Sequence, residues 1–173
     1  MEKDVKKELL CNKETEMCLD IVITKRQFFE QHSISTHPKN HDLKVGWKIV
    51  TLKKMGVYPG NQYSTTPFKI ATWMHESSLR EGSGPQKRLN SSSGRSYPIG
   101  FHVCINKRSA ELFAHDYGFL TSRGGIIIKV YFKDACAYGT QDSSILIITK
   151  DMYIPHQIPF GTTGRCRPCK ARI

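Results

Sequence analysis

The segment GFHVCINKRSAELFAHDYG, residues 100–118, carries the two elements that decide the fold. Its first six residues are mostly apolar, which is typical of a strand. Asn106 then offers a good N-cap side chain, and Gly118 stands where a C′ glycine ends a helix. Between these two residues the apolar side chains recur at i, i+3, i+4 and i+7, the spacing of one helix face: Ala110, Phe113, Ala114 and Tyr117. The segment therefore predicts a strand followed by a packed helix over 107–117.

Further strand-like segments lie on both sides of this unit. Residues 126–132, IIIKVYF, are β-branched and aromatic and predict a largely buried strand, and residues 145–149, ILIIT, predict another. Upstream, residues 44–52 alternate apolar and polar side chains, and residues 68–74 and 19–23 favour shorter strands. We expect an α+β fold, a single domain with a mostly antiparallel sheet of about five to seven strands and one main packed helix.

The chain length of 173 residues fits one domain with one sizeable core. We expect a charged N-terminal segment at 1–20, the α+β domain at 21–160 and a basic, cysteine-containing tail at 161–173. Inside the domain, residues 77–97 combine serines and glycines with few large apolar side chains. This composition predicts a flexible basic loop, because loops of such length in compact domains are generally functional or disordered.

The sequence predicts an intracellular protein, cytoplasmic or nuclear, without a transmembrane segment. No apolar run approaches the roughly 18–20 residues that a membrane-spanning helix needs. The first eight residues, MEKDVKKE, are charged and lack the apolar centre of a secretory signal peptide.

Net charge is the global property that points to a partner. Twenty-six Lys and Arg stand against 15 Asp and Glu, a formal charge of +11. The excess is uneven: residues 1–20 hold six acids and four lysines, whereas residues 21–173 carry 22 basic and nine acidic side chains, a balance of +13. Such a balance favours nucleic acid or another polyanion, or an acidic protein partner. The alternative is a solvated basic surface with no dedicated partner.

We take polyanion binding without base-specific readout as the leading hypothesis, with Lys and Arg contacting phosphates. The candidate contacts are basic residues of the 77–97 loop and of the tail: Arg80, Lys87, Arg88, Arg95, Arg165, Arg167, Lys170 and Arg172. If they are exposed, four aromatic residues could add base stacking: Tyr58, Tyr63, Trp73 and Tyr97. Core packing is the competing role for these rings.

Six cysteines divide into two groups. Cys104 and Cys136 lie in apolar, strand-like surroundings, where a free cysteine is commonly a small core residue. The other four lie near the termini: Cys11, Cys18, Cys166 and Cys169. The last two have the spacing of half a zinc knuckle, so these four are the candidate zinc ligands. The alternative is four terminal thiols without a ligand, and we expect no cofactor under the binding hypothesis.

A second function class is an enzyme acting on a nucleotide substrate. Its candidate catalytic residues are His75, Tyr97 and His102, since histidine is the commonest general acid or base. His102 stands between Phe101 and Val103, so strand alternation places its side chain on the opposite face. The sequence contains no phosphate-binding glycine motif, no zinc-protease motif and no nucleophile elbow.

The order of these segments over residues 44–154 resembles small uncharacterised α+β domains of viral and animal proteomes, which bring no known activity. Its strand–helix–strand rhythm is also similar to part of the ADP-ribosyltransferase fold. That resemblance implies NAD as the cofactor, with His75 on an early strand and Tyr97 in a middle position. It also implies a catalytic Glu on a late strand, but residues 126–132 and 145–149 contain none. We therefore expect a degenerate site rather than an active transferase.

Overall fold

The computed structural model describes residues 19–53, 56–59, 67–79, 88–116 and 125–156. Within them the strands and helices are, in chain order, β1 (Ile21–Ile23), α1 (Lys25–Gln31), β2 (Thr36–His37), β3 (Asn40–Lys53), β4 (Gly56–Pro59), β5 (Trp73–His75), the 3₁₀ helix η1 (Glu76–Leu79), β6 (Arg88–Asn90), β7 (Ser96–Pro98), β8 (Phe101–Cys104), α2 (Lys107–Asp116), β9 (Gly125–Gln141) and β10 (Ser144–Tyr153). The fold is mostly antiparallel sheet with two α-helices, consistent with the predicted α+β class.

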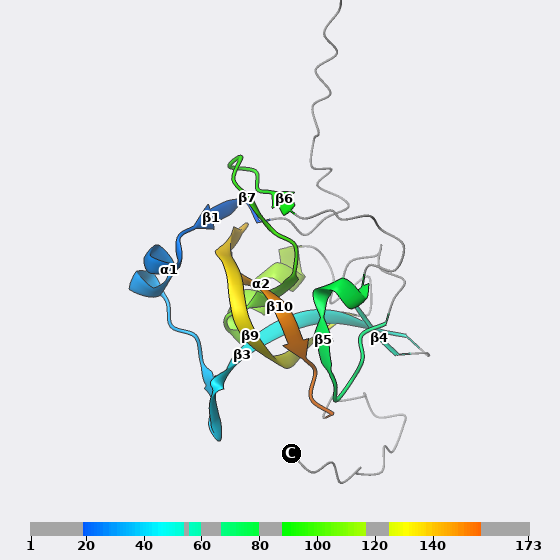
Figure 1. The fold of residues 1–173 in the computed structure, drawn as a ribbon. Coiled ribbons are helices and arrows are strands. Elements are labelled where there is room, and N and C mark those ends of the chain that lie inside the picture. The colour runs from blue at the N-terminus through cyan, green and yellow to red at the C-terminus, as the bar shows by residue number, and fades with distance from the viewer. Residues whose placement is uncertain (1–18, 54–55, 60–66, 80–87, 117–124, 157–173) are drawn as a thin grey trace, which may run out of the picture.

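The main sheet closes on itself (Figure 1). Its strand order is β1-β9-β10-β8-β3-β2, and β3 pairs with β9 as well as with β8. Strands β9, β10, β8 and β3 therefore form a ring. The link between β3 and β8 is the narrowest, because it consists of one residue pair, Trp47 with Cys104, among the described residues. Strands β4 and β5 extend the ring by pairing with β3 and β10.

Strand β9 is long, and three strands pair with different parts of it. Residues 125–132 pair with β3, residues 131–141 pair with β10, and residues 138–140 pair with β1. In this part of the chain the sequence predicted strands over 126–132 and 145–149, and the structure extends them to 125–141 and 144–153. The last residues of β10, 151–153, lie between β9 and β5.

The helix predicted after Asn106 is confirmed as α2. The Asn106 side chain accepts a hydrogen bond from the backbone N–H of Ser109 at 2.8 Å, which caps the first turn. Phe113 then packs with Ile49 of β3 and Ile127 of β9. Because these two residues are paired across the strands, α2 covers one part of the outer surface of the ring.

Two apolar clusters stabilise the ring from its two sides. The larger includes side chains that alternate with the outward-facing ones along β3, β8, β9 and β10, among them Val50, Val103, Val130, Phe132, Ile147 and Met152. The second lies beneath α2 and the β6–β7 hairpin and includes Leu19, Tyr97, Cys104, Ala110, Leu146 and Ile148. Burial of such side chains contributes roughly 1.5–3 kcal/mol each relative to exposure.

The prediction of one continuous loop over 77–97 is wrong for residues 77–79, which belong to η1, and for residues 88–97, whereas residues 80–87 lie outside the described residues. Residues 88–90 and 96–98 pair as the antiparallel hairpin β6–β7. The serine- and glycine-rich segment between them forms the turn, in which the Ser91 hydroxyl bonds to the backbone O and N–H of Arg95 at 2.9 and 3.0 Å. Gly94 has a φ of 79°, a conformation that glycine adopts without steric cost.

The described part of the chain contains no helix that is long and apolar enough to cross a membrane.

Candidate functional site

Tyr97, one of the three predicted catalytic residues, is a core side chain. It lies on β7 and is 1% exposed. Its hydroxyl oxygen accepts a hydrogen bond from the backbone N–H of Leu19 at 2.8 Å, which ties the hairpin to the segment before β1. Its ring centroid is 6.2 Å from that of His102 in an edge-to-face arrangement. The structure therefore brings Tyr97 and His102 together, in a packing contact.

The ring of His102 lies on the face of β8 opposite Phe101 and Val103, as the alternation predicts. Burial, together with the nearby positive charge of Lys48, lowers the pKa of His102 to about 3, whereas a hydrogen bond with the Gly100 backbone acts in the opposite direction. The imidazole is therefore neutral at physiological pH. Its Nε2 atom is buried and has no hydrogen-bond partner among the described residues.

His75 does not join these two residues, so the three do not form one catalytic centre. Its Nδ1 atom is 2.8 Å from the hydroxyl of Ser77 and accepts the Ser77 backbone N–H at 3.3 Å. The Ser78 hydroxyl donates to the His75 carbonyl at 2.6 Å. These contacts cap η1. Along β10, His75 pairs with Asp151, three residues beyond Ile148, which pairs with His102.

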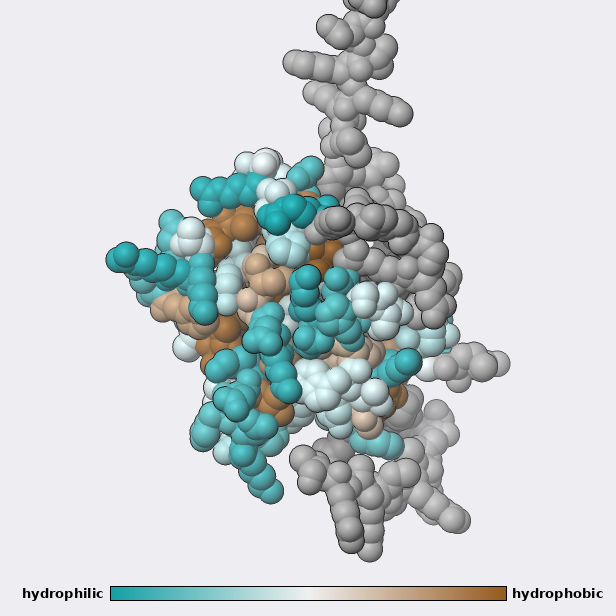
Figure 2. Space-filling view, in the orientation of Figure 1, coloured by the Kyte–Doolittle hydropathy of each residue, from teal (hydrophilic) through white to brown (hydrophobic). Residues whose placement is uncertain are grey.

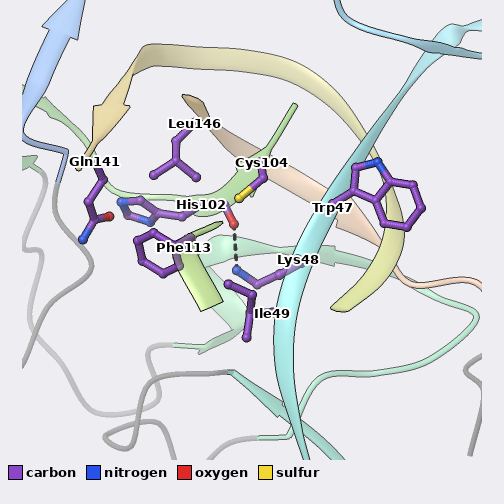
Figure 3. Close-up of a pocket in the computed structure, with 8 residues that line it drawn as sticks. All are labelled: Trp47, Lys48, Ile49, His102, Cys104, Phe113, Gln141 and Leu146. Atoms are coloured by element: carbon purple, nitrogen blue, oxygen red, sulfur yellow. Dashed lines mark hydrogen bonds between the residues drawn. The ribbon is translucent and has the colours of Figure 1, made fainter. Parts of the chain in front are cut away.

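A small pocket lies between β3, β8 and α2 (Figure 3). It is lined by Trp47, Lys48, Ile49, His102, Cys104, Phe113, Gln141 and Leu146. The cavity volume of about 10 Å³ is close to what a single water molecule occupies. A nucleotide or any other organic substrate does not fit in this space.

Lys48 is the charged residue that the sequence analysis did not single out in this pocket. It is 4% exposed, and its amino group donates a hydrogen bond to the His102 carbonyl at 2.9 Å (Figure 3). Burial lowers the pKa of Lys48 to about 8, although Cys104 opposes the shift. Strands β3 and β8 share only one residue pair in the described chain. The hydrogen bond from Lys48 to the His102 carbonyl adds a second connection between the two strands next to this pair.

Cys104 is a buried core thiol, as predicted. It is 3% exposed, and burial raises its pKa to about 12, so it stays protonated and unreactive. Cys136 is half-buried and its pKa is raised for the same reason. Among the described residues no cluster of His, Cys, Asp and Glu could hold a metal ion. The four candidate zinc ligands, Cys11, Cys18, Cys166 and Cys169, lie outside the described residues.

Two of the predicted polyanion contacts are described, and both fasten the hairpin. Arg88 donates to the hydroxyl and to the carbonyl of Ser96, each at 2.8 Å. Arg95 donates to the Val22 carbonyl of β1 at 3.0 Å. Arg88 and Arg95 are nevertheless exposed residues. The other six lie outside the described part of the chain: Arg80, Lys87, Arg165, Arg167, Lys170 and Arg172.

A row of aromatic rings crosses the outer surface of the sheet where α2 does not cover it. We define the aromatic row as Tyr131 of β9, Tyr153 of β10 and Trp73 of β5, which lie opposite one another in register. The Tyr131 and Tyr153 rings are stacked with centroids 6.3 Å apart, and the Tyr153 and Trp73 centroids are 5.7 Å apart. His37 extends the row, 5.0 Å from Tyr131. Trp73 is 38% exposed.

Two exposed lysines stand on either side of Tyr131 on the same face of β9. The amino group of Lys133 lies 4.6 Å from the centroid of Trp73, and that of Lys129 lies 5.5 Å from the centroid of Trp47. Asp151 contributes an acid to this face, since it pairs in register with Lys133 and with His75. In the view of Figure 2, hydrophilic side chains cover most of the described surface, with small hydrophobic areas between them.

Sequence reasoning missed this face because residues 126–132 were interpreted as a largely buried strand. The signal was nevertheless present, since Lys129, Tyr131 and Lys133 recur at every second position and so share one face of a strand. Trp73 was named as a stacking candidate, and its exposure meets the stated condition. Tyr97 was named too, but it is buried and therefore excluded from stacking.

No family model matches this chain, and comparisons with curated proteins and with solved structures found no match. The resemblances to uncharacterised α+β domains and to ADP-ribosyltransferases therefore stay predictions.

Proposed function

We propose that this protein binds nucleic acid through phosphate contacts and without base-specific readout. The observation that carries the proposal is the pair of exposed lysines, Lys129 and Lys133, beside aromatic rings on a part of the sheet that α2 does not cover. A surface of this kind supplies both the positive charge that phosphates need and flat rings. The basic residues predicted from the 77–97 region and from the tail remain part of the proposal.

Counterion release gives the proposal a quantitative signature. Each phosphate that a lysine neutralises frees condensed cations, so the logarithm of the binding constant falls linearly with the logarithm of salt concentration. The slope is about −0.9 per contact on duplex DNA and about −0.7 per contact on single strands. Because the lysines would contact phosphates rather than base edges, affinity should depend little on base sequence.

The test compares two variants that lose the same charge from different places. Lys129→Gln with Lys133→Gln removes two positive charges beside the aromatic row. Lys107→Gln with Arg108→Gln removes two from α2, on another part of the surface. We expect the first variant to bind a single-stranded oligonucleotide more weakly, with a salt slope less steep by about 1.4 if both lysines contact phosphate. The second variant should stay close to the wild type.

Two results would overturn the proposal. In the first, the wild-type protein shows no binding to any nucleic acid at low salt, which would leave an acidic protein as the partner that the charge favours. In the second, both double variants weaken binding equally, which would mean that net charge acts without a site. Neither the burial of Tyr97 nor the separation of His75 from His102 favours the alternative of an NAD-dependent enzyme.

A further inference from the structure

We infer that the aromatic row is a stacking platform for unpaired bases, so that the protein prefers single-stranded nucleic acid to duplex. This inference rests on the proposed function and assigns it a substrate class. Tyr131, Tyr153 and Trp73 belong to three neighbouring strands and pair in register, with the Tyr131 and Tyr153 rings stacked on each other and the Trp73 ring tilted against that of Tyr153. A single strand that reaches the row from the β5 side would meet the Trp73 ring first.

The end of the row at Trp73 is the accessible one. Trp73 is 38% exposed, whereas Tyr131 and Tyr153 are only partly exposed. Among the described residues, β5 pairs with β10 and with no further strand, so no neighbouring strand flanks Trp73 on its other side. An indole ring at this position can receive a base on its face, as in proteins that bind single strands by stacking.

Charge around the row fits a polyanionic occupant. Lys133 lies over the Trp73 ring, and Lys129 stands two residues before Tyr131 on the same strand face. Asp151, paired in register with Lys133, is an acid on this face. A base that stacks on Trp73 would displace the ammonium group of Lys133 toward the neighbouring phosphate. The ring and the amine would then contact the same nucleotide.

Duplex nucleic acid cannot use this platform, because its bases are already stacked and paired inside the helix. It can still contact the lysines through its phosphates. The inference therefore predicts a preference that charge alone does not give. Cross-strand aromatic pairs also stabilise sheets in proteins without ligands, so the test needs a readout besides stability.

The experiment measures the affinity of wild type, Trp73→Leu, Trp73→Phe and Phe29→Leu for an oligo-dT strand, a duplex of equal length and heparin. Phe29 is the matched control, since it is an aromatic residue exposed to 46% on α1. We expect Trp73→Leu to lose roughly 5- to 150-fold in affinity for oligo-dT, the loss typical of one stacked base. Affinity for duplex and heparin should change less than about twofold.

Trp73→Phe should recover part of the loss, because phenylalanine keeps an aromatic face. Phe29→Leu should bind like wild type, and circular dichroism with thermal unfolding verifies that each variant is folded. If oligo-dT, duplex and heparin bind equally and Trp73→Leu changes none or all of them alike, the stacking inference fails while the proposed function stands. If the wild type binds none of the three, the proposed function fails and the inference with it.

Discussion

At the scale of single residues, Lys133 and Trp73 determine whether stacking can occur. A cation–π contact at an exposed site is worth about 0.5–1 kcal/mol. Stacking of a base on an aromatic side chain is worth about 1–3 kcal/mol. Exchange of the Lys133 ammonium for a base at the Trp73 face is therefore favourable, since the displaced ammonium can pair with a phosphate. The contact between the Lys133 ammonium and the Trp73 ring is compatible with this exchange.

Lys48 makes the stability of the protein depend on pH above neutrality. Its folded-state pKa of about 8 lies below the ordinary value of 10.5, because burial disfavours the charged form. Between these two values the unfolded chain binds the proton more tightly, so the free energy of unfolding rises as pH increases from 8 toward 10.5. Below pH 8 Lys48 is charged in both the folded and the unfolded chain, so the free energy of unfolding no longer changes with pH through this residue.

We predict that the wild type gains about 1 kcal/mol in free energy of unfolding relative to Lys48→Met between pH 7.5 and 9. The range stops at pH 9 because the Cys104 thiol, whose folded pKa is raised from 9.0 to about 12, acts in the opposite direction above it. Urea denaturation at each pH measures the difference. The exposed control Lys69→Met should run parallel to the wild type, and a parallel Lys48→Met curve would contradict the prediction.

At the scale of elements, α2 could be predicted from sequence because its code is local. The cap at Asn106 and the apolar spacing up to Ala114 need no distant partner to be recognised. Strands β6 and β7 could not be predicted from sequence, since each has three residues and little apolar alternation. Their pairing depends on Arg88 bonding to Ser96 and on Tyr97 bonding to Leu19, a residue 78 positions away.

The candidate site was hidden from sequence for a related reason. The alternation of Lys129, Tyr131 and Lys133 shows that they share a face, but it does not say whether a helix covers that face. Trp73 joins them only through the register of β5 with β10 and of β10 with β9. Pairings between segments so distant in the chain are set by the whole packed sheet, so local patterns do not contain them.

Strand β1 offers an element-scale test, because its docking on β9 requires glycine at position 139. A Cβ atom there would overlap the Ile21 backbone oxygen. We predict that Gly139→Ala lowers the free energy of unfolding by about 1–3 kcal/mol, the usual cost of overpacking. The substitution should also expose the backbone amides that connect the β6–β7 hairpin to the residues just before β1. One of them is the N–H of Ser93, which donates a hydrogen bond to the Asp20 carbonyl.

Urea denaturation and amide hydrogen exchange measure these two effects. Gly94→Ala is the comparison, since nothing lies within 4 Å of a Cβ atom at that position. Its positive φ alone should cost roughly 1–2 kcal/mol. Faster exchange at Ser93 in Gly139→Ala than in wild type is the expected result. Unchanged exchange there would show that β1 adapts to the added methyl group.

At the scale of the whole molecule, closure of the sheet into a ring gives an outer surface whose parts differ in character. One part is covered by α2 and another by the β6–β7 hairpin, and both carry apolar residues. The part formed by β9, β10 and β5 is not covered by α2 and carries lysines and aromatic rings. The positive net charge of +11 would attract a polyanion, and this face is where we place it.

The most direct test is an NMR titration of ¹⁵N-labelled protein with an oligo-dT strand at low salt. We predict that backbone signals of residues 73–75, 129–133 and 151–153 shift together, along with the indole N–H of Trp73. Signals of α1, which carries basic residues of its own, should stay in place and serve as the internal control. Shifts centred on α1 or on α2, with residues 73 and 131–133 unchanged, would contradict the assignment of this face as the binding site.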